Sequence, residues 1–144
     1  MKPKSIKIIC DDREPKSMDL TALVVGGIEF ERKRLKTGDY IFEDVCIERK
    51  EINDFCGSIL DGRLNSQIKK MKRDFKYNYI LISGSIKNRT SMIKENCILG
   101  KMASILVKHQ IPIITVDDDF QLVYLLKRIF EKHLEIKKMK GGIK

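Results

Sequence analysis

At 144 residues, with 42% hydrophobic side chains, the chain is long enough to bury one core and too apolar to be disordered. Its 29 Lys and Arg against 20 Asp and Glu give a formal charge of +9. This surplus predicts a polyanionic partner, with nucleic acid as the first candidate and an anionic membrane as the second. The alternative is a lysine-rich surface that serves only solubility. No apolar run approaches the about 20 residues of a membrane span, and the apolar stretch at 6–10 is too short for a signal peptide. We therefore expect an intracellular protein without a membrane partner. Its place would be the cytoplasm or nucleoid, or the nucleus of a eukaryote.

The first half of the chain is predicted to be rich in strands, with one short helix. Short apolar runs bounded by Gly, Pro and Asp predict the strands, and Gly26-Gly27 ends a helical pattern. Two such runs on either side of Glu43-Asp44 predict a β-hairpin. The predicted elements are a strand at 6–10, a polar loop at 11–17, a helix at 18–25, a strand at 28–35 and hairpin strands at 40–42 and 45–49.

The second half is predicted to alternate helices with strands. Apolar residues at three- and four-residue steps from Phe55 to Phe75 predict one long helix with a basic opposite face. The elements predicted after it are a strand at 79–82, a basic loop at 83–90, a helix at 98–107, a strand at 111–116 and a helix from the cap at 117–119 to about Leu134. This order predicts an α/β fold with a mixed, mostly parallel central sheet flanked by helices, in one domain over 1–135 and a basic, flexible tail at 136–144.

The cysteines and histidines do not predict a metal or disulfide site. The four cysteines form no CxxC pair and lie in apolar runs, and the two histidines have no ligand-like spacing to them or to each other. We therefore expect the cysteines to be small core residues.

Acidic residues follow three strand-like segments, and one group forms a D…ExK pattern at Asp39, Glu48 and Lys50. Two neighbouring carboxylates supply the hard oxygen ligands that Mg²⁺ or Mn²⁺ prefers, and such a cation polarises a phosphodiester and acidifies water. Because alternate residues of a strand share a face, Lys50 projects beside Glu48, toward the phosphate or the attacking water. The pattern predicts metal-dependent phosphodiester hydrolysis, and an exposed strand with alternating charges is the alternative.

The residues around this pattern make it more specific. They resemble the GD…ERKxxxD signature of XPF-type structure-specific endonucleases, together with a DxRE loop after the opening strand and a DGRL element with a nearby glutamine. The resemblance extends from about Ile6 to Leu134 and is closest to archaeal nuclease domains, including that of Hef. The matching segments are 10–14, 38–40, 47–50, Asp54, 58–64 and Gln67.

The resemblance implies a restriction-endonuclease-like version of the α/β fold, and a role for each matched residue. Asp54 has an alternative as a first-turn acid of the long helix, and Arg63 has one as an exposed helix cation. The residues with an implied catalytic role are Asp11, Glu14, Asp39, Glu48, Lys50 and Asp54. Those implied to bind Mg²⁺ or Mn²⁺ are Asp39, Glu48 and Asp11. Those implied to contact DNA or the scaffold are Arg13, Arg49, Arg63 and Gln67.

The predicted function is a metal-dependent endonuclease that hydrolyses phosphodiesters in flap, fork or otherwise branched DNA, in repair, recombination or replication-fork processing. The alternatives are a non-catalytic DNA-binding scaffold subunit and a PD-(D/E)xK nuclease or resolvase of different specificity. Larger members of the family add a tandem helix-hairpin-helix module that grips duplex DNA. We expect none within these 144 residues, which leaves a separate DNA-binding partner open.

Apolar residues are in excess in the C-terminal half of the chain. One sheet face cannot easily cover them all, which predicts a homodimer through this half, as the family resemblance also implies. The alternative is a pair of fully buried core helices. The residues concerned are Ile98, Leu99, Met102, Ile105, Leu106, Leu122, Val123, Leu125, Leu126, Ile129 and Phe130.

Overall fold

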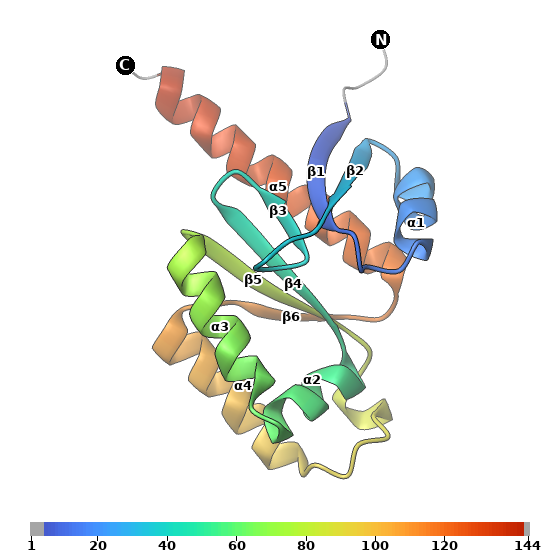
Figure 1. The fold of residues 1–144 in the computed structure, drawn as a ribbon, viewed down its shortest axis with the longest axis vertical. Coiled ribbons are helices and arrows are strands. Elements are labelled where there is room, and N and C mark those ends of the chain that lie inside the picture. The colour runs from blue at the N-terminus through green and yellow to red at the C-terminus, as the bar shows by residue number, and fades with distance from the viewer. Residues whose placement is uncertain (1–4, 143–144) are drawn as a thin grey trace.

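The structure is a computed structural model that describes residues 5–142 (Figure 1). No helix in this range combines the length and the apolar character needed to cross a membrane. The elements are β1 (Ile6–Asp11), α1 (Ser17–Val25), β2 (Ile28–Lys33), β3 (Tyr40–Phe42), β4 (Val45–Glu51), α2 (Ile52–Leu60), α3 (Arg63–Asp74), β5 (Tyr77–Ser83), the 3-10 turn η1 (Ile86–Asn88), α4 (Glu95–His109), β6 (Ile113–Val116) and α5 (Asp119–Gly142).

The six strands form one sheet in the order β2-β1-β3-β4-β5-β6. Strands β1 and β2 are parallel, as are β4, β5 and β6, whereas β3 is antiparallel to both of its neighbours. The predicted hairpin is confirmed, because Phe42 pairs with Val45 across a turn in which Glu43 takes a positive φ of 53°. The predicted α/β class with a mixed, mostly parallel sheet is therefore confirmed.

Helices cover both faces of the sheet (Figure 1). Helices α1 and α5 pack on one face, where Ile8, Met18 and Phe130 share a single buried cluster. Helices α2, α3 and α4 pack on the other face, where Phe55, Ile68 and Ile98 belong to a second cluster. The sheet thus separates two cores, and the side chains of each strand alternate between them.

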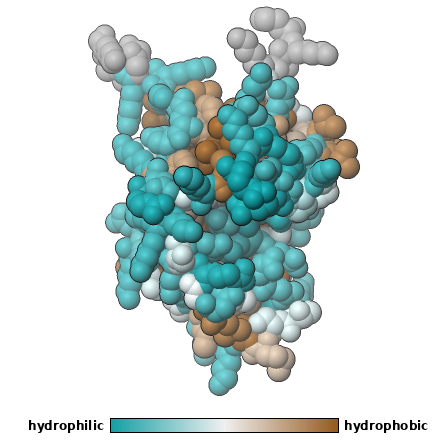
Figure 2. Space-filling model, viewed as in Figure 1, coloured by the Kyte–Doolittle hydropathy of each residue, from teal (hydrophilic) through white to brown (hydrophobic). Residues whose placement is uncertain are grey.

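The helices α2–α4 leave half of their face of the sheet open. Alternate residues of β1 and β2 that point to this side, such as Lys7, Glu29 and Glu31, are exposed. Figure 2 shows hydrophilic side chains over most of the face that carries α3, and an apolar patch over α1, where Leu20 and Leu23 are exposed. The border between the open and the covered half of the sheet lies at β3 and β4, and the candidate site lies there.

The largest differences from the predicted helices are a break in the long helix and the length of the last one. The long helix expected from Phe55 to Phe75 is two helices, because Gly62 takes a left-handed φ of 82° between α2 and α3. The apolar period continues across this break, which is why the sequence pattern did not reveal it. The last helix was expected to end near Leu134, but α5 continues to Gly142. Most of the predicted tail at 136–144 is therefore helical, and residues 143 and 144 lie outside the described residues.

The apolar residues of the C-terminal half divide into two groups. The core of the monomer buries six of them, as the alternative of buried core helices predicts for these positions. They are Leu122, Val123, Leu126 and Phe130 of α5 and Ile98 and Ile105 of α4. The exposed apolar side chains of α4 and α5 include Leu99, Leu106, Val107, Phe120 and Tyr124.

Candidate active site

The turn before β3 brings Asp39 between two strands. Gly38 takes a left-handed φ of 77°, and a Cβ there would clash with the Cys46 sulfur, so the turn requires glycine. The Asp39 N–H donates to the Ile47 carbonyl at 3.0 Å, and the Asp39 carbonyl accepts from the Asp11 N–H at 2.8 Å. The backbone of Asp39 is thus held between β1 and β4.

The carboxylates of Asp39 and Glu48 lie close together at this point. Glu48 is buried, and protein surrounds Asp39 on most sides although it keeps some exposure. Burial raises the pKa of Asp39 well above its usual range, and the charge of Glu48 raises it further. The Arg49 N–H, which donates to the Asp39 carboxylate at 2.8 Å, opposes this shift only in part. The pair is a site of unfavourable negative charge.

Lys50 shares a face of β4 with Glu48, as the strand period predicts. Cys46, Glu48 and Lys50 are all buried and alternate with Ile47 and Arg49. Cys46 belongs to the core under α2–α4, which places Glu48 and Lys50 on that side of the sheet. Lys50 lies close enough to Asp61 to lower the pKa of that carboxyl group, although the main cause is the Arg63 N–H.

Arg49 points to the opposite face of β4 and is paired with Glu14. The Arg49 Nε donates to one Glu14 oxygen at 2.7 Å and a terminal nitrogen donates to the other at 3.3 Å. The two side chains keep only 17% and 9% exposure, so the pair is largely removed from water. Burial raises the pKa of Glu14, and the bonds from Arg49 oppose that rise. The pair lies beside the two carboxylates, and the charge of Asp39 also raises the pKa of Glu14.

Asp11 is held by its own loop. One of its oxygens accepts from the Leu35 N–H at 3.0 Å, and the Arg13 Nε donates to the other at 2.8 Å. Because of these bonds, the pKa of the Asp11 carboxyl group is lowered despite its burial. Arg13 also donates to the Leu35 carbonyl at 2.9 Å, so the two residues together fasten the segment that leads to Gly38.

A pocket of about 370 Å³ lies beside Asp11, Glu14, Asp39 and Glu48, at the border between the open and the covered half of the sheet. Helix α3 supplies Gln67 and Lys70 to its wall. The Gln67 side-chain oxygen is buried and has no hydrogen-bond partner among the described residues. The remaining wall residues are Asp11, Arg13, Glu14, Leu35, Lys36, Thr37, Gly38, Asp39 and Glu48.

Four predicted site residues do not line this pocket. Arg49 points to the other face of β4, where it binds Glu14. Lys50 is buried beside it, Asp54 is exposed in the first turn of α2, and Arg63 is exposed and bound to Asp61 through a 2.7 Å ion pair. The positions of Asp54 and Arg63 agree with the first-turn acid and the exposed helix cation that the sequence left as alternatives. The structure thus brings Asp11, Arg13, Glu14, Asp39, Glu48 and Gln67 to one pocket.

The donor set at Asp39 and Glu48 fits a hard divalent cation. Mg²⁺ commonly binds through one or two carboxylates and completes its shell with water and substrate phosphate. Within residues 5–142, no group of three or more Asp, Glu, His or Cys side chains is spaced to hold an ion together, so the metal role of Asp11 stays a prediction. A cation would replace the repulsion between Asp39 and Glu48 with attraction.

Sequence reasoning missed two residues that support the pocket, Thr37 and Asp74. The Thr37 hydroxyl donates to an Asp74 oxygen at 2.5 Å, which ties the Gly38 turn to the end of α3. Arg73 also donates to Asp74 at 2.7 Å, and together these bonds lower the pKa of Asp74. Thr37 and Asp74 are 37 positions apart, and no local pattern connects them.

The ERCC4 domain family model matches residues 10–129 of this chain. The chain is 37% identical, over 130 residues that are 90% of its length, to a protein of Methanocaldococcus jannaschii that carries the name of an ATP-dependent RNA helicase. It is 30% identical, over 88% of its length, to the 3′-flap repair endonuclease Xpf of Saccharolobus solfataricus. The chain spans only 16% and 55% of the lengths of these two relatives.

Solved structures agree with this match. XPF from Aeropyrum pernix superposes with a TM-score of 0.77 at 25% identity, over 86% of this chain and 61% of that one. The same protein in complex with DNA superposes with a TM-score of 0.76, over 88% of this chain and 65% of that one. With these matches and the carboxylate pair in the pocket, the chain belongs to the ERCC4 domain family, whose fold is that of the XPF nuclease domain.

Proposed function

We propose that this chain is a divalent-metal-dependent endonuclease that hydrolyses phosphodiesters in branched DNA. The observation that carries the proposal is the Asp39–Glu48 pair, in a pocket open to solvent, with Lys50 on the same face of β4 as Glu48. A purely structural strand gains nothing from two like charges at this position, because their repulsion destabilises the fold. Such unfavourable pairs are typical of sites that bind a cation or move a proton.

Each residue has a role in this proposal. Asp39 and Glu48 would hold Mg²⁺ or Mn²⁺, which when bound supplies Lewis-acid polarisation of the phosphate and acidification of water. Lys50 would place a positive charge beside Glu48, where the oxygens of the reacting phosphate gain negative charge. Gln67 offers an oxygen at the pocket wall that no group of residues 5–142 binds and that can accept a hydrogen bond from water. Glu14 and Arg49 would hold β4 and the Asp39 turn in register from the other face.

Basic side chains near the pocket support DNA as the substrate. Arg13, Lys36 and Lys70 line its wall, and Lys69 and Arg73 are exposed on α3. Such cations neutralise backbone phosphates, so DNA affinity should fall steeply with salt. One relative is named as a 3′-flap repair endonuclease, which makes a 3′ flap the first substrate to test.

We also propose a homodimer formed through α4, β6 and α5. Strand β6 is an edge of the sheet, and Leu99, Leu106 and Tyr124 on the flanking helices are 46%, 45% and 49% exposed. An unpaired edge flanked by apolar side chains is suited to a symmetric contact. Sedimentation that finds only monomer at high micromolar concentration would contradict it, and a separate DNA-binding partner would then be the next candidate for gripping the duplex.

Cleavage of labelled DNA with and without metal tests the catalytic proposal. The wild-type chain should cut a 3′ flap in Mn²⁺ or Mg²⁺ and not in chelator, and Glu48→Gln should bind the flap but not cut it. A panel of flap, fork, nicked and four-way DNA would separate the flap or fork enzyme from a resolvase. Metal-dependent binding without cutting of any substrate would favour the non-catalytic scaffold instead.

A further inference from the structure

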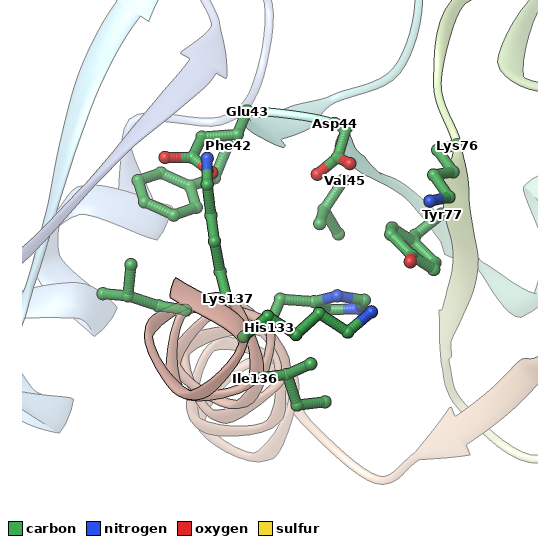
Figure 3. A pocket seen from close by; sticks show the side chains of 11 residues that line it. Phe42, Glu43, Asp44, Val45, Lys76, Tyr77, His133, Ile136 and Lys137 are labelled. Carbon is green, nitrogen blue, oxygen red and sulfur yellow. The ribbon is translucent and has the colours of Figure 1, made fainter. Parts of the chain in front are cut away.

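A second hollow lies on the other face of the sheet from Glu48 and Lys50. It occupies about 210 Å³ between the β3–β4 hairpin, the start of β5 and the last turns of α5 (Figure 3). In Figure 3, Asp44 from the hairpin points toward His133 of α5, and Tyr77 from β5 lies beside the His133 ring. Nothing in the proposed cleavage mechanism uses these residues.

One wall of the hollow is aromatic and held in place. The rings of Tyr77 and His133 lie with centroids 4.7 Å apart and an angle of 47° between their planes. The Tyr79 hydroxyl lies 2.7 Å from the His133 Nε2, which fixes the orientation of the imidazole. Burial lowers the pKa of His133, with partial opposition from Asp44, which favours the neutral form of the ring. A flat, uncharged ligand can stack on such a wall.

The rim carries charges that are only partly satisfied. Glu43 and Lys137 neutralise each other through an ion pair of 2.6 Å. Asp44, Lys76 and Lys140 also line the hollow, and none of them has an ion-pair partner within residues 5–142. The Lys76 ammonium lies over the Tyr77 ring, 5.3 Å from its centroid, on a flexible exposed side chain that a stacked ligand can displace. The hollow therefore combines an aromatic wall with one carboxylate and two ammonium groups that form no ion pair within residues 5–142.

We propose that this hollow binds a single nucleotide, with its base stacked on Tyr77 and His133, its N–H donors on the Asp44 carboxylate and its phosphate near Lys76 and Lys140. A carboxylate only accepts hydrogen bonds, so it favours guanine, which presents two adjacent N–H donors on one edge. Thymine presents a single N–H between two carbonyl oxygens and is disfavoured. A space of about 210 Å³ is below the ~300–1,000 Å³ of sites for drug-sized ligands, so it suits one base rather than a duplex.

The nucleotide can come from an unpaired DNA strand or from the free pool. The first source rests on the proposed function, because binding of branched DNA brings a splayed single strand to this domain. Bases that leave the stack are commonly held by aromatic side chains and read on their Watson–Crick edge. The second source does not depend on cleavage, and the test distinguishes the two.

Proton NMR of the histidines offers a direct test with an internal control. The chain has two histidines, and His109, at the end of α4, does not line the hollow. Titration of deoxyguanosine monophosphate without divalent metal should move the His133 ring signals and leave those of His109 in place. Thymidine monophosphate should bind more weakly. A His133 signal unmoved at about 10 mM nucleotide, well above a millimolar Kd, would overturn the proposal.

Two variants identify the contacts. Asp44→Asn keeps the shape of an exposed side chain and removes its charge, so it should weaken guanosine monophosphate binding by about tenfold or more and erase the preference over thymidine monophosphate. The matched control is Glu29→Gln, an exposed carboxylate on β2, which should change neither. Lys76→Gln should weaken the nucleotide and spare the nucleoside. A guanine preference that survives Asp44→Asn would refute the assigned orientation.

The source is decided by comparing nucleotide with strand. A short thymine strand with one central guanine that binds more tightly than the free nucleotide, and more tightly than an all-thymine strand, identifies single-stranded DNA. A free nucleotide bound at least as tightly identifies the pool. These titrations use the Glu48→Gln chain without metal. If the hollow binds no nucleotide, the result for cleavage by the wild-type chain still stands. If the wild-type chain does not cleave DNA, the His133 shift can still be measured.

Discussion

Strand β4 has a pair of opposite charges on one face and a pair of like charges on the other. On one face, Arg49 and Glu14 form a largely buried pair of opposite charges with two hydrogen bonds. On the other face, Glu48 stands beside Asp39, whose pKa is raised by burial and further by the charge of Glu48. Consecutive residues of one strand thus belong to a satisfied and to an unsatisfied pair, because the pleat sends them to opposite sides.

The difference indicates how the domain can hold an unfavourable site. An uncompensated buried charge destabilises a fold, and sites that need one rely on rigid surroundings. Here the rigid part is the Arg49 backbone and side chain together, because its N–H binds Asp39 while its guanidinium binds Glu14. One residue connects the pair that stabilises the scaffold to the pair that supports chemistry.

The largest expected effect comes from removing the cation beside the like-charged pair. Lys50→Met keeps the aliphatic stem of a side chain that is 6% exposed and removes its charge. Single-turnover cleavage should fall by about 10²–10³-fold, the usual loss of one preorganised donor at the reacting oxygens. DNA affinity should change little, since one cation among 29 is lost. Cleavage within about threefold of wild type, a loss below ~1 kcal/mol, would make Lys50 a structural residue.

Lys108→Ala is the matched control for that experiment. Lys108 is exposed in the last turn of α4, away from the pocket. It should change neither cleavage nor binding measurably. Melting temperatures of both variants separate a loss of catalysis from a loss of fold.

Breaking the opposite-charge pair should reduce stability rather than chemistry. Glu14→Leu leaves the Arg49 guanidinium buried without its partner and should lower the free energy of unfolding by roughly 3 kcal/mol. The double variant Glu14→Leu/Arg49→Leu removes both charges and should recover part of this loss. Denaturant titration of the two single variants and the double variant measures the coupling. Strictly additive losses would show that the pair contributes nothing as a pair.

The Gly38 turn can be altered without changing any charge. In Gly38→Ala, the left-handed φ of 77° and the clash with the Cys46 sulfur act together. The cost should be about 2 kcal/mol of unfolding free energy, and Asp39 should shift relative to Glu48, so metal affinity falls as well. Thermal melts and Mn²⁺ calorimetry check the two effects. Adding Cys46→Ala makes room for the new methyl group and should restore part of the stability, whereas no rescue would leave only the backbone strain.

The smallest effect is a gain that depends on pH. Asp39→Asn keeps an oxygen for the Arg49 N–H and removes the like charge, so the metal-free variant should be more stable than wild type at pH 7, by roughly 1 kcal/mol. The folded-state pKa of Asp39 is raised, so its ionised form costs stability above that pKa. As pH falls toward the unfolded value near 3.9, Asp39 gains its proton and the difference should close. A difference that is constant from pH 7 to about pH 4.5 would contradict the raised pKa.

Much of the carboxylate site was predictable from sequence because it rests on local rules. The strand period places Glu48 and Lys50 together and sends Arg49 away, and Gly38 predicts the turn that directs Asp39. The same period predicts the hairpin at Glu43-Asp44. These inferences need only a few neighbouring residues.

Other parts of the site depend on contacts that no local rule describes. Asp11 matches the family motif, yet the Leu35 N–H and Arg13 bind its oxygens, and only the folded loop reveals this. Pairing of Glu14 with Arg49, 35 positions apart, is equally invisible to pattern. The break at Gly62 escaped because a glycine within an apolar helical period is compatible with a continuous helix.

The last helix carries a consequence for how the chain folds during its synthesis. Leu122, Val123, Leu126 and Phe130 complete the core over Ile8 and Met18, which a ribosome makes about a hundred residues earlier. At 5–20 residues per second, the apolar sides of β1 and α1 remain uncovered for roughly ten seconds before α5 can cover them. Every wall residue of the carboxylate pocket lies at or before Lys70. The ribosome therefore synthesises all of these residues well before the chain can fold into the complete domain. A chain interrupted before Leu122 should therefore expose this surface to chaperones and aggregation.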